Sequence, residues 1–444
     1  MKQIFLIGAG RSVGSLISYL YNYSQTEKIH LTIGDKNLLH AEGLIKDFTH
    51  AKAIFFDVSD NEILKEEVKK ADLVISMLPA HLHFSVAEMC VACGKHMLTA
   101  SYVSSEILAL GDQARSNRVK IIMEAGLDPG LDHMSAMAEI NDIKEKGGKI
   151  VLFKSFTGGL IAPSDDTNPW NYKLTWNPRN VVLAGQGVTQ FIRNNRYKYI
   201  PYNNLFNRVE LIKVKGFGFF EGYANRDSLK YRELYNLGDI PTILRGTLRR
   251  TGFCKAWNVF VQLGMTDDTY QLESLNGMTY REFINCFLIY SDTLSVEEKV
   301  IEYFNLNPEG EVYKKLEWLG IFDNEKIGLT EGSPAMVLQE LLELKWVLEP
   351  EDKDMVVMQH QFEYQIDKKM ERVISSFVII GADAKHTAMA KTVGLPLGIL
   401  AKLILEDKLP VVGVHIPVVK EIYEPVLKEL DKLGIRFKRE LIKM

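Results

Sequence analysis

Cysteine is scarce in this sequence, with only four residues in 444. So few thiols cannot form the disulfide framework of a secreted domain, which favours a reducing compartment such as the cytoplasm. An excess of positive charge is also missing, because 53 Lys and Arg residues stand against 57 Asp and Glu residues, a formal net charge of -4. This balance gives no basic field that would bind nucleic acid or an anionic membrane.

Long apolar runs are missing as well. We find no stretch that approaches the roughly 20 apolar residues needed to cross a bilayer. The opening MKQIFLIGAG stops at glycines, as a buried strand does, and does not continue as a signal peptide. What is present is a globular composition, 46% hydrophobic and 25% charged. It predicts about three domains of roughly 150 residues each, in a cytoplasmic protein whose partner is a small molecule.

The first 125 residues alternate short β-rich runs with longer segments of helical spacing. The runs predict strands at 2–8, 29–35, 53–58, 71–78, 96–100 and 119–125. Strands joined by helical crossovers pair in parallel, because a right-handed crossover returns the chain in the same direction. We therefore predict a doubly wound Rossmann sheet over residues 1–130, completed by about 385–444. Such a sheet binds its ligands at the carboxyl ends of the strands.

From about residue 147 the runs become longer and alternate apolar with polar residues. They predict strands at 149–156, 208–223, 355–366 and 370–380. We expect an α/β substrate domain with a mixed or antiparallel sheet, formed by 131–265 and 348–384. Aromatic side chains at helical intervals predict a small helical insert over 266–347, and a further helix is expected at 386–406.

The strongest local signal is the segment GAGRSVG (8–14), between the first strand and the first helix. Gly8 allows the tight turn, Gly10 lets a pyrophosphate approach the backbone, and the helix N-terminus supplies N–H donors. Asp35 ends the second strand, where a carboxylate accepts hydrogen bonds from the adenosine ribose and repels a 2′-phosphate. The segment predicts a dinucleotide site, and Asp35 favours NAD over NADP, although a lysine and a histidine follow it closely and could weaken the repulsion.

A second signal is GLDPGLDH (126–133), at the exit of the sixth predicted strand. Asp128 followed by Pro129 is a good cap and first-turn pair, so a helix is expected to start there and to continue to Lys146. Its N–H groups would face the carboxyl edge of the sheet, where a nicotinamide should bind. The alternative for Asp128 and His133 is a plain capped helix that joins two domains.

Arginines form a third group, at Arg179, Arg226 and Arg245. Guanidinium groups bind carboxylates through two parallel hydrogen bonds, so several arginines near one pocket suit a substrate with several carboxylates. Solvated surface arginines are the alternative.

Two patterns that could indicate a metal are interpreted otherwise. Cys90 and Cys93 have the spacing of a zinc pair, but no second pair exists and both lie on an apolar predicted helix. His81 and His83 lack a carboxylate at a suitable spacing and are interpreted as loop histidines. No metal site is predicted.

Together the motifs resemble the saccharopine reductase family, the glutamate-forming saccharopine dehydrogenases. The most specific segments are GLDPGLDH (126–133) and NRDS (225–228). Further resembling segments cover nearly the whole chain in the family's order: LVISMLPAHLHFSVAEMC (73–90), TASYVS (99–104), NPWNYKLTWNPRNVVLA (168–184), RGTLRRTGF (245–253), DMVVMQHQF (354–362) and AMAKTVGLPLGILAKLIL (388–405).

The resemblance implies a Rossmann domain, an α/β saccharopine-binding domain and a small helical domain. It implies that saccharopine, NAD(P)⁺ and water are converted to L-glutamate, 2-aminoadipate 6-semialdehyde and NAD(P)H, in lysine metabolism. The implied cofactor residues are Gly8, Gly10, Arg11, Ser12, Val13, Asp35, Asp57, Val58, Leu78, Pro79, Ala100, Ser101, Leu127, Asp128 and Pro129. The implied substrate residues are Ser101, Tyr102, Asp128, Arg226, Arg245, Gly246 and Thr247.

The chain departs from the family pattern in two places. Members usually carry YCGGLPAPE where this chain has FTGGLIAPS (156–164), so any role of that cysteine thiol is absent. NADP-using members often have an arginine or a neutral residue at the position of Asp35, and this supports the expectation of NAD.

Oxidation of a secondary amine requires a group near the nitrogen that manages protons, and Asp128 and Tyr102 are the candidates. We expect Asp128 chiefly to orient the amine. Two rival functions stay open: a related reductive condensation such as a carboxyspermidine-type synthase, which would need a diamine pocket lined with acids, and a non-catalytic NAD(P)-binding sensor. We expect a homodimer with no nucleic-acid or membrane partner.

Overall fold

The structure is a computed structural model that describes residues 1–443 and divides into two compact units. The first comprises Met1–Lys149 and Gly381–Arg439, and the second comprises Ile150–Ile380 and the residues that follow Arg439. The first unit extends beyond residue 130, where the sequence placed its boundary, because helix α7 (Leu131–Glu145) packs on α16 (Lys420–Lys432). At that contact Asn141 Nδ2 donates to Tyr423 OH at 2.7 Å.

The first unit is built on a seven-stranded sheet whose paired strands all run parallel, in the order β15-β6-β5-β4-β1-β2-β3. The strands are β1 (Lys2–Ile7), β2 (Ile29–Asp35), β3 (Ala51–Phe55), β4 (Leu73–Ser76), β5 (His96–Thr99), β6 (Lys120–Ile122) and β15 (Gly413–His415). The order reverses between β1 and β4, which creates the switch point where doubly wound sheets bind ligands. The predicted Rossmann sheet is confirmed, with β15 from the tail as an edge strand.

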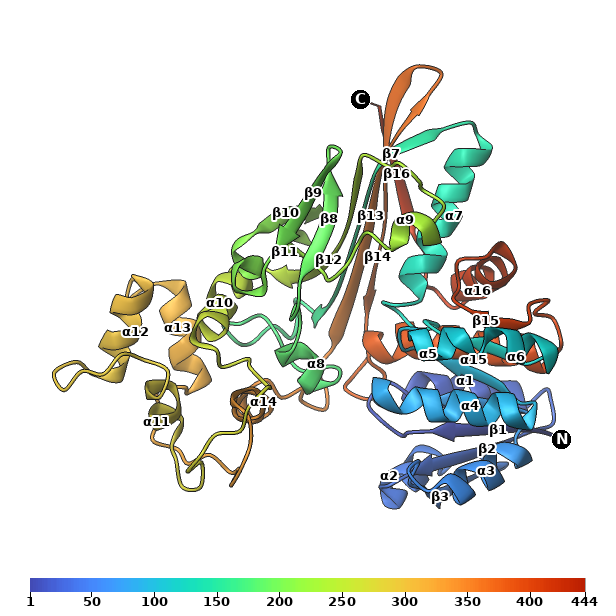
Figure 1. The fold of residues 1–444 in the computed structure, drawn as a ribbon, viewed down its shortest axis with the longest axis horizontal. Helices are drawn as coiled ribbons and strands as arrows, with labels where there is room; N and C mark the ends of the chain where they lie inside the picture. Colours follow the sequence, from blue (N-terminus) through green and yellow to red (C-terminus); the bar gives the residue numbers. More distant parts are fainter. Residues whose placement is uncertain (444) are drawn as a thin grey trace. The chain divides into compact units, whose positions relative to one another are not determined.

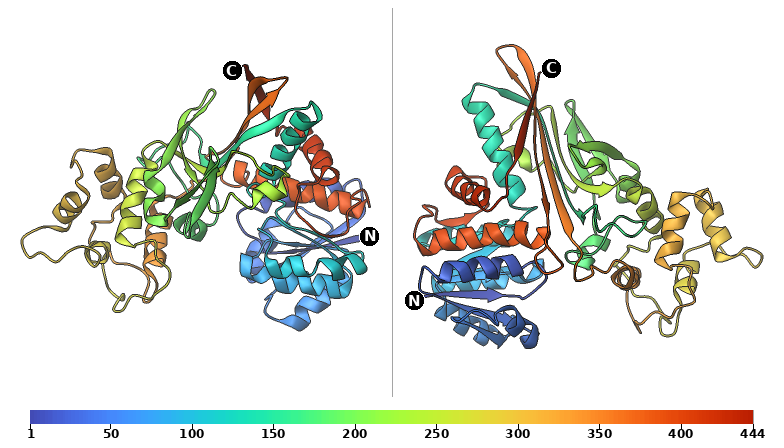
Figure 2. Two further views of the ribbon diagram at one scale, coloured as in Figure 1. Left: turned by 45° about the horizontal axis from the view of Figure 1, so that its top comes forward. Right: turned by 180° about the vertical axis from the view of Figure 1, so that it is seen from behind.

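Helices cover this sheet on both faces (Figure 1). They are α1 (Gly14–Ser24), α2 (Leu38–Leu44), α3 (Asn61–Lys70), η1 (Ala80–Leu82), α4 (His83–Cys93), α5 (Ser105–Ala109), α6 (Gly111–Ser116) and α15 (Ala388–Leu405). Helix α16 packs on α15, and α7 packs on α16. The right panel of Figure 2 shows α15 beside α1. The two backbones are so close that a Cβ added at Gly394 would lie 2.7 Å from the backbone nitrogen of Leu16.

Helix α15 corrects one expectation from the sequence. Its 18 residues have a mean hydropathy of 1.6, so by length and composition alone this helix could cross a membrane. However, 72% of these residues are buried within the protein, as in the core helix of a globular domain.

The second unit is built on a mixed sheet with the order β10-β11-β12-β7-β13-β14-β16, and β8 and β9 extend it from β12. Its strands are β7 (Lys149–Ile161), β8 (Thr189–Arg193), β9 (Arg196–Ile200), β10 (Val209–Val214), β11 (Gly218–Ala224), β12 (Thr242–Arg250), β13 (Asp354–Ile366), β14 (Lys369–Ile380) and β16 (Lys438–Lys443). Strands β12 and β7 pair in parallel, whereas β11 pairs with β12 and β13 with β14 in antiparallel fashion. The predicted mixed sheet is confirmed.

The helices of the second unit pack around a core rich in aromatic side chains. They are η2 (Tyr202–Asn207), α8 (Pro178–Val182), α9 (Tyr231–Leu234), α10 (Phe253–Leu263), α11 (Tyr280–Asn285), α12 (Val296–Phe304), α13 (Glu311–Leu319) and α14 (Pro334–Lys345). Residues 266–347, where a helical insert was predicted, contain α11 to α14 and no strand. Trp170, Trp257 and Trp346 lie at the centre of the core and are at most 1% exposed.

One strand expectation was wrong, and some strands were not predicted. The single strand predicted at 208–223 is a hairpin of β10 and β11, because the chain turns at Gly216 with a φ of +84°. A positive φ is accessible to glycine without steric cost. Strands β8, β9 and β12 were not predicted, and β12 carries Arg245.

Candidate active site

The glycine segment forms the turn between β1 and α1, as predicted. Gly8 has a φ of +97°, and a Cβ added there would lie 2.9 Å from the carbonyl oxygen of Met77, so only glycine fits. A Cβ added at Gly10 would meet no atom within 4 Å. The backbone at Gly10 therefore borders open space at the N-terminus of α1, and this combination suits a pyrophosphate.

The Asp35 carboxylate, at the end of β2, accepts hydrogen bonds from backbone N–H groups. Its Oδ2 accepts from Ala9 N at 2.7 Å, and its Oδ1 accepts from Asn37 N at 2.7 Å. Asp35 thus ties the glycine turn to the end of β2. Because each oxygen already accepts a backbone hydrogen bond, the carboxylate has a structural task in addition to any contact with a ribose.

Asp57 lies after β3, close to the same edge of the sheet. Its Oδ2 is 2.9 Å from Lys36 Nζ, and its Oδ1 accepts from Ser59 N and Ser59 Oγ at 3.0 and 2.8 Å. These contacts, that with Lys36 first, lower the pKa of Asp57 to about 2. Asp57 therefore stays ionised and holds the Lys36 ammonium beside the end of β2.

The other predicted cofactor residues also follow the carboxyl ends of strands. Arg11, Ser12 and Val13 follow β1, Val58 follows β3, Leu78 and Pro79 follow β4, Ala100 and Ser101 follow β5, and Leu127, Asp128 and Pro129 follow β6.

The segment after β6 differs from its sequence interpretation. Helix α7 begins at Leu131 with Gly130 at its N-cap and no side-chain cap, so the expectation that Asp128 and Pro129 start the helix was wrong. The reason is the close packing of two glycines, since a Cβ added at Gly130 would lie 2.2 Å from Gly126 O. Asp132 Oδ1 instead accepts from Gly130 N at 2.7 Å. Asp128 therefore does not cap α7.

The carboxylate of Asp128 accepts a hydrogen bond from the Tyr102 hydroxyl, with 3.2 Å between Oη and Oδ1. Tyr102 lies in the segment after β5, and Asp128 in the segment after β6. The structure thus brings together the two residues that the sequence indicated for proton transfer. A phenol donating to a carboxylate is a pair that can pass a proton or orient an amine.

His83 is a site residue that the sequence analysis misjudged. It is the first residue of α4 and 1% exposed, so its interpretation as a loop histidine was wrong. Nδ1 lies 2.9 Å from Ser76 Oγ, and Nε2 lies 2.6 Å from Ser101 Oγ. Burial, followed by the charge of nearby His81, lowers the pKa of His83 to about 4. A neutral imidazole has one donor and one acceptor nitrogen, so the ring fixes the orientation of the Ser101 hydroxyl.

Glu124, which the sequence analysis did not single out, holds the segment Ser101–Val103 from the other side. Its Oε1 accepts from Val103 N at 3.0 Å, and its backbone nitrogen donates to Ser101 O at 2.9 Å. Its Oε2 is 2.7 Å from His133 Nε2, which donates because a carboxylate can only accept. Glu124 and His133 are 2% and 0% exposed. We call His83, Glu124 and His133 the buried clamp, because together they fix the segment that carries Ser101 and Tyr102.

A sequence signal for the clamp existed. Glu124 lies just before the motif GLDPGLDH, which contains His133, and His83 lies in a segment that resembles the family. Nothing in the sequence shows that these three residues converge, because they come from α4, the end of β6 and α7.

In the second unit, β12 presents Arg245 and Thr247 on one face of the sheet. Arg245 is paired in register with Ser155, and Thr247 with Thr157, so these side chains share that face. Arg245 is 6% exposed, and its guanidinium lies 4.1 Å from the ring centroid of Tyr231. Stacking on an aromatic ring holds the planar group in one orientation.

The NRDS segment is bound to β12 by backbone contacts. Asn225 N donates to Arg245 O at 2.8 Å, and Arg245 N donates to Ser228 Oγ at 2.9 Å. Arg226 lies between these contacts with a φ of +47°. Gly246 leaves room for the Phe156 ring on the neighbouring strand, because a Cβ at residue 246 would lie 2.6 Å from that ring.

Two further residues of the second unit have clear environments. Arg179 is ion-paired with Asp268, so it is engaged within the protein. Thr157 replaces the cysteine usual in the family, and its Oγ1 is buried with no hydrogen-bond partner in residues 1–443. A buried hydroxyl without a partner is uncommon, and a ligand on the Arg245 face would satisfy it.

Comparison with known proteins covers both units. The family model of the saccharopine dehydrogenase NADP binding domain matches residues 4–122, and that of the saccharopine dehydrogenase C-terminal domain matches residues 126–435. A similar curated protein is the Schizosaccharomyces pombe saccharopine dehydrogenase [NADP(+), L-glutamate-forming], 31% identical over 100% of this chain and 99% of the relative. The mitochondrial alpha-aminoadipic semialdehyde synthase of Mus musculus is 33% identical over 98% of this chain and 47% of the relative.

A solved structure is similar over the full length. The apo saccharopine dehydrogenase (L-Glu forming) from Saccharomyces cerevisiae has a TM-score of 0.89 with 29% sequence identity and covers 100% of both chains.

The comparisons correct the cofactor expectation. The matching model is that of an NADP binding domain, and relatives from Schizosaccharomyces pombe and Pyricularia oryzae are named as NADP(+) enzymes, so the preference for NAD over NADP was wrong. The structure gives a physical reason, because both Asp35 oxygens bind backbone N–H groups and the Lys36 ammonium lies beside Asp57. An acid at the end of β2 therefore does not indicate NAD in this chain.

Proposed function

The chain belongs to the saccharopine dehydrogenase family, and from this membership we propose that it oxidises saccharopine to L-glutamate and 2-aminoadipate 6-semialdehyde. The observation that carries the proposal is the full-length similarity to a relative named as the NADP(+), L-glutamate-forming enzyme. Two contacts support the proposal: the hydrogen bond between Tyr102 and Asp128, which suits proton transfer, and the stacking of Arg245 on Tyr231, which suits binding of a carboxylate.

The overall reaction fixes what the protein has to do. Saccharopine is a secondary amine with three carboxylates. A hydride leaves the carbon derived from lysine Cε, water adds to the resulting imine, and the C–N bond breaks to give the aldehyde and glutamate. The chain must therefore bind carboxylates, place one carbon correctly and accept or deliver protons at the nitrogen and at the attacking water.

The residues of the first unit fit NADP. We propose that the turn from Gly8 to Val13 binds the pyrophosphate, because the backbone at Gly10 borders open space. Lys36, held beside the end of β2 by Asp57, supplies a positive charge at the edge where a 2′-phosphate would bind. When bound, NADP⁺ supplies the hydride acceptor.

We propose that Asp128 and Tyr102 manage protons. The Asp128 carboxylate, which accepts from the Tyr102 hydroxyl, can accept a further hydrogen bond from a substrate N–H and so orient the amine. While its one proton is donated to Asp128, the Tyr102 oxygen can accept a hydrogen bond from the water that attacks. Turnover that is unchanged in Asp128→Ala would contradict this role.

Carboxylate binding is assigned to Arg245 and Arg226. Arg245 is buried and stacked, which leaves its fork of N–H donors in a fixed orientation. Thr247 and Thr157 lie on the same face and add hydroxyl donors. This set of donors suits a substrate with several carboxylates and does not suit a diamine.

The test is to incubate the purified chain with saccharopine and NADP⁺ and to follow nicotinamide absorbance while the products are identified. We expect reduction coupled to the release of glutamate. Lysine and 2-oxoglutarate as products would contradict the proposed site of cleavage, and no reduction with either nicotinamide cofactor would contradict the enzymatic function.

The cytoplasmic location and the homodimer stay predictions. Cell fractionation tests the first, and sedimentation of the purified chain tests the second.

A further inference from the structure

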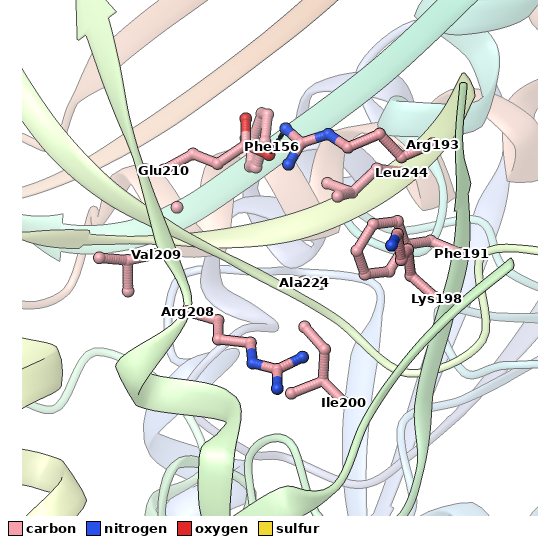
Figure 3. A pocket seen from close by; sticks show the side chains of 11 residues that line it. Phe156, Phe191, Arg193, Lys198, Ile200, Arg208, Val209, Glu210, Ala224 and Leu244 are labelled. Atoms are coloured by element: carbon pink, nitrogen blue, oxygen red, sulfur yellow. Dashed lines mark hydrogen bonds and ion pairs between the residues drawn. The ribbon is translucent and has the colours of Figure 1, made fainter. Parts of the chain in front are cut away.

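A cavity of about 340 Å³ lies in the second unit, lined by strands β8 to β12 and by Phe156 of β7 (Figure 3). The register places it on the face of the sheet opposite Arg245. Leu244 lines the cavity and directly precedes Arg245, while Phe156, which also lines it, is paired with Gly246. Successive residues of a strand point to opposite faces, so the sheet separates this cavity from the Arg245 side chain.

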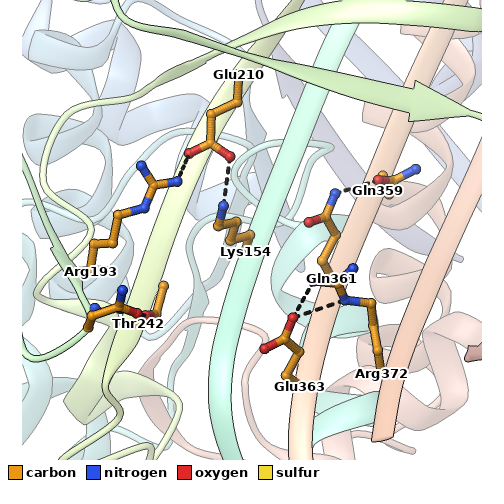
Figure 4. A network of polar contacts seen from close by, with 9 residues as sticks. Lys154, Arg193, Glu210, Thr242, Gln359, Gln361, Glu363 and Arg372 are labelled. Carbon is orange, nitrogen blue, oxygen red and sulfur yellow. Dashed lines mark hydrogen bonds and ion pairs between the residues drawn. The ribbon is translucent and has the colours of Figure 1, made fainter. Parts of the chain in front are cut away.

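The charged side chains around the cavity are mainly cations, namely Arg193, Lys198 and Arg208, with Glu210 as the acid. Glu210 is already neutralised, since its Oε2 is 2.6 Å from Lys154 Nζ and its Oε1 is 2.5 Å from Arg193 (Figure 4). Lys154 is 9% exposed, so the ion pair between Lys154 and Glu210 is partly buried in the wall of the cavity.

Lys198 and Arg208 have no side-chain hydrogen bond or ion pair among the residues that the structure describes. Figure 3 shows the two side chains at different parts of the cavity rim, with Arg208 beside Ile200 and Lys198 beside Phe191. The chain as a whole is acidic, with a net charge of -4. The local excess of positive charge is therefore a property of this cavity and favours the entry of anions.

The floor between the cations is apolar. Phe191, Ile200 and Leu244 line it, and they are at most 7% exposed. Gly222 and Ala224 line it as well, and a Cβ at Gly222 would lie 2.9 Å from the Phe156 ring. A concave apolar surface with a few convergent polar groups is the usual form of a small-molecule site.

We propose that this cavity binds a short aliphatic dicarboxylate, whose methylene groups cover the apolar floor while its carboxylates pair with Lys198 and Arg208. Guanidinium and ammonium groups are the natural partners of carboxylates. The acid in the cavity is already paired with two cations, so no group remains to bind the ammonium of an amino acid or a polyamine. The site does not depend on the proposed function, because it lies on the opposite face of the sheet.

The test is calorimetric titration of the full chain with glutarate. We expect binding with a dissociation constant of about 1 mM, weakened roughly tenfold in Arg208→Gln and in Lys198→Gln and lost in the double variant. The matched control is Lys255→Gln, which removes an exposed lysine of α10 outside the cavity, and it should bind as the wild type does. Arg245→Ala should also bind normally, because Arg245 lies on the other face.

Four outcomes would overturn the proposal. Glutarate that does not bind, or that binds equally to the double variant, shows that these cations form no site. Binding that is lost in Arg245→Ala places glutarate at the opposite face of the sheet. Inorganic phosphate that binds as tightly as glutarate contradicts recognition of the aliphatic part. Because the readout is binding and not turnover, failure here leaves the proposed dehydrogenase activity untouched, and the reverse also holds.

Discussion

At the scale of single residues, the proposed substrate contacts are concentrated on few side chains. Arg245 combines burial with a ring contact of 4.1 Å to Tyr231, so its guanidinium is oriented before any ligand arrives. A binding group that is oriented in advance loses little entropy when the ligand binds.

We predict that Arg245→Ala lowers kcat/KM for saccharopine about 30-fold to 150-fold, since one bidentate charged contact contributes roughly 2 to 3 kcal/mol. Steady-state kinetics with saturating NADP⁺ measures this, and the KM for NADP⁺ should not change. Arg245→Lys should recover part of the loss, because it keeps the charge but not the planar fork. Unaltered kinetics in Arg245→Ala would remove the residue from the substrate site.

His83 predicts a pH dependence of stability. Its pKa is about 4 in the folded protein, against 6.5 for an ordinary histidine, so between these values the unfolded state binds more protons. Stability should therefore fall as the pH is lowered from about 6.5 to about 4, by up to roughly 3 kcal/mol from this group. Urea unfolding across this range should show a shallower pH dependence in His83→Gln than in the wild type. Equal slopes in the two proteins would show that His83 is protonated in the folded state.

Some features of the site could be predicted from the sequence, and others could not. The glycine turn was predictable because only glycine fits a tight turn with a positive φ and a close backbone neighbour, as at Gly8. The role of Asp35 was not, because its partners Ala9 and Asn37 are brought to it only by the pairing of β1 with β2. His83 was misjudged because a helix that starts at His83 cannot be told from a loop by spacing alone.

At the scale of elements, the buried clamp joins α4, β6 and α7 to the segment after β5. Its three polar side chains are at most 2% exposed, so each lost partner leaves a buried group unsatisfied. The segment it holds carries Tyr102, whose hydroxyl donates to Asp128.

We expect Glu124→Gln to lower kcat about tenfold with little change in the KM for NADP⁺, because the amide can accept from Val103 N or from His133 but not from both. The matched control is His96→Ala, which removes the acceptor of Lys120 N at 3.1 Å where β5 and β6 begin. That edge of the sheet is opposite the site, so kcat should be retained. If both variants lose kcat equally, the clamp acts only through stability.

A pair of glycines tests the contact between α15 and α1. Gly394→Ala should destabilise the protein by about 1 to 3 kcal/mol through overpacking, because the new Cβ would lie 2.7 Å from Leu16 N. Gly43→Ala, on α2, meets no atom within 4 Å and should stabilise by roughly 0.5 to 1 kcal/mol. Urea unfolding compares the two, and equal effects of the same substitution would mean that α15 does not pack on α1.

Prediction of the elements from the sequence was best where periodicity was strong. Strands β1 to β6 of the parallel sheet were predicted because they are apolar runs bounded by turns, as in β2 (Ile29–Asp35), whereas the short β15 was not predicted. Strand β12 was missed since its sequence TILRGTLRR places arginines on one face, and only the structure shows that Arg245 and Arg249 are buried.

At the scale of the whole molecule, the central claim is the reaction itself: hydride is removed from the carbon derived from lysine Cε, with NADP⁺ as acceptor and glutamate as the amine product. The fold alone cannot decide this, because doubly wound sheets support many dehydrogenases. The full-length relatives named as NADP(+), L-glutamate-forming enzymes support it. The cofactor preference inferred from Asp35 was wrong, because the sequence does not reveal that the Asp35 carboxylate binds backbone N–H groups.

The most direct measurement uses saccharopine deuterated at that carbon, incubated with the purified chain and NADP⁺. The account predicts that deuterium appears in the reduced nicotinamide, that glutamate is released, and that NADP⁺ is used more efficiently than NAD⁺. Reduced nicotinamide without deuterium, accompanied by lysine and 2-oxoglutarate, would show cleavage on the other side of the nitrogen and contradict the account.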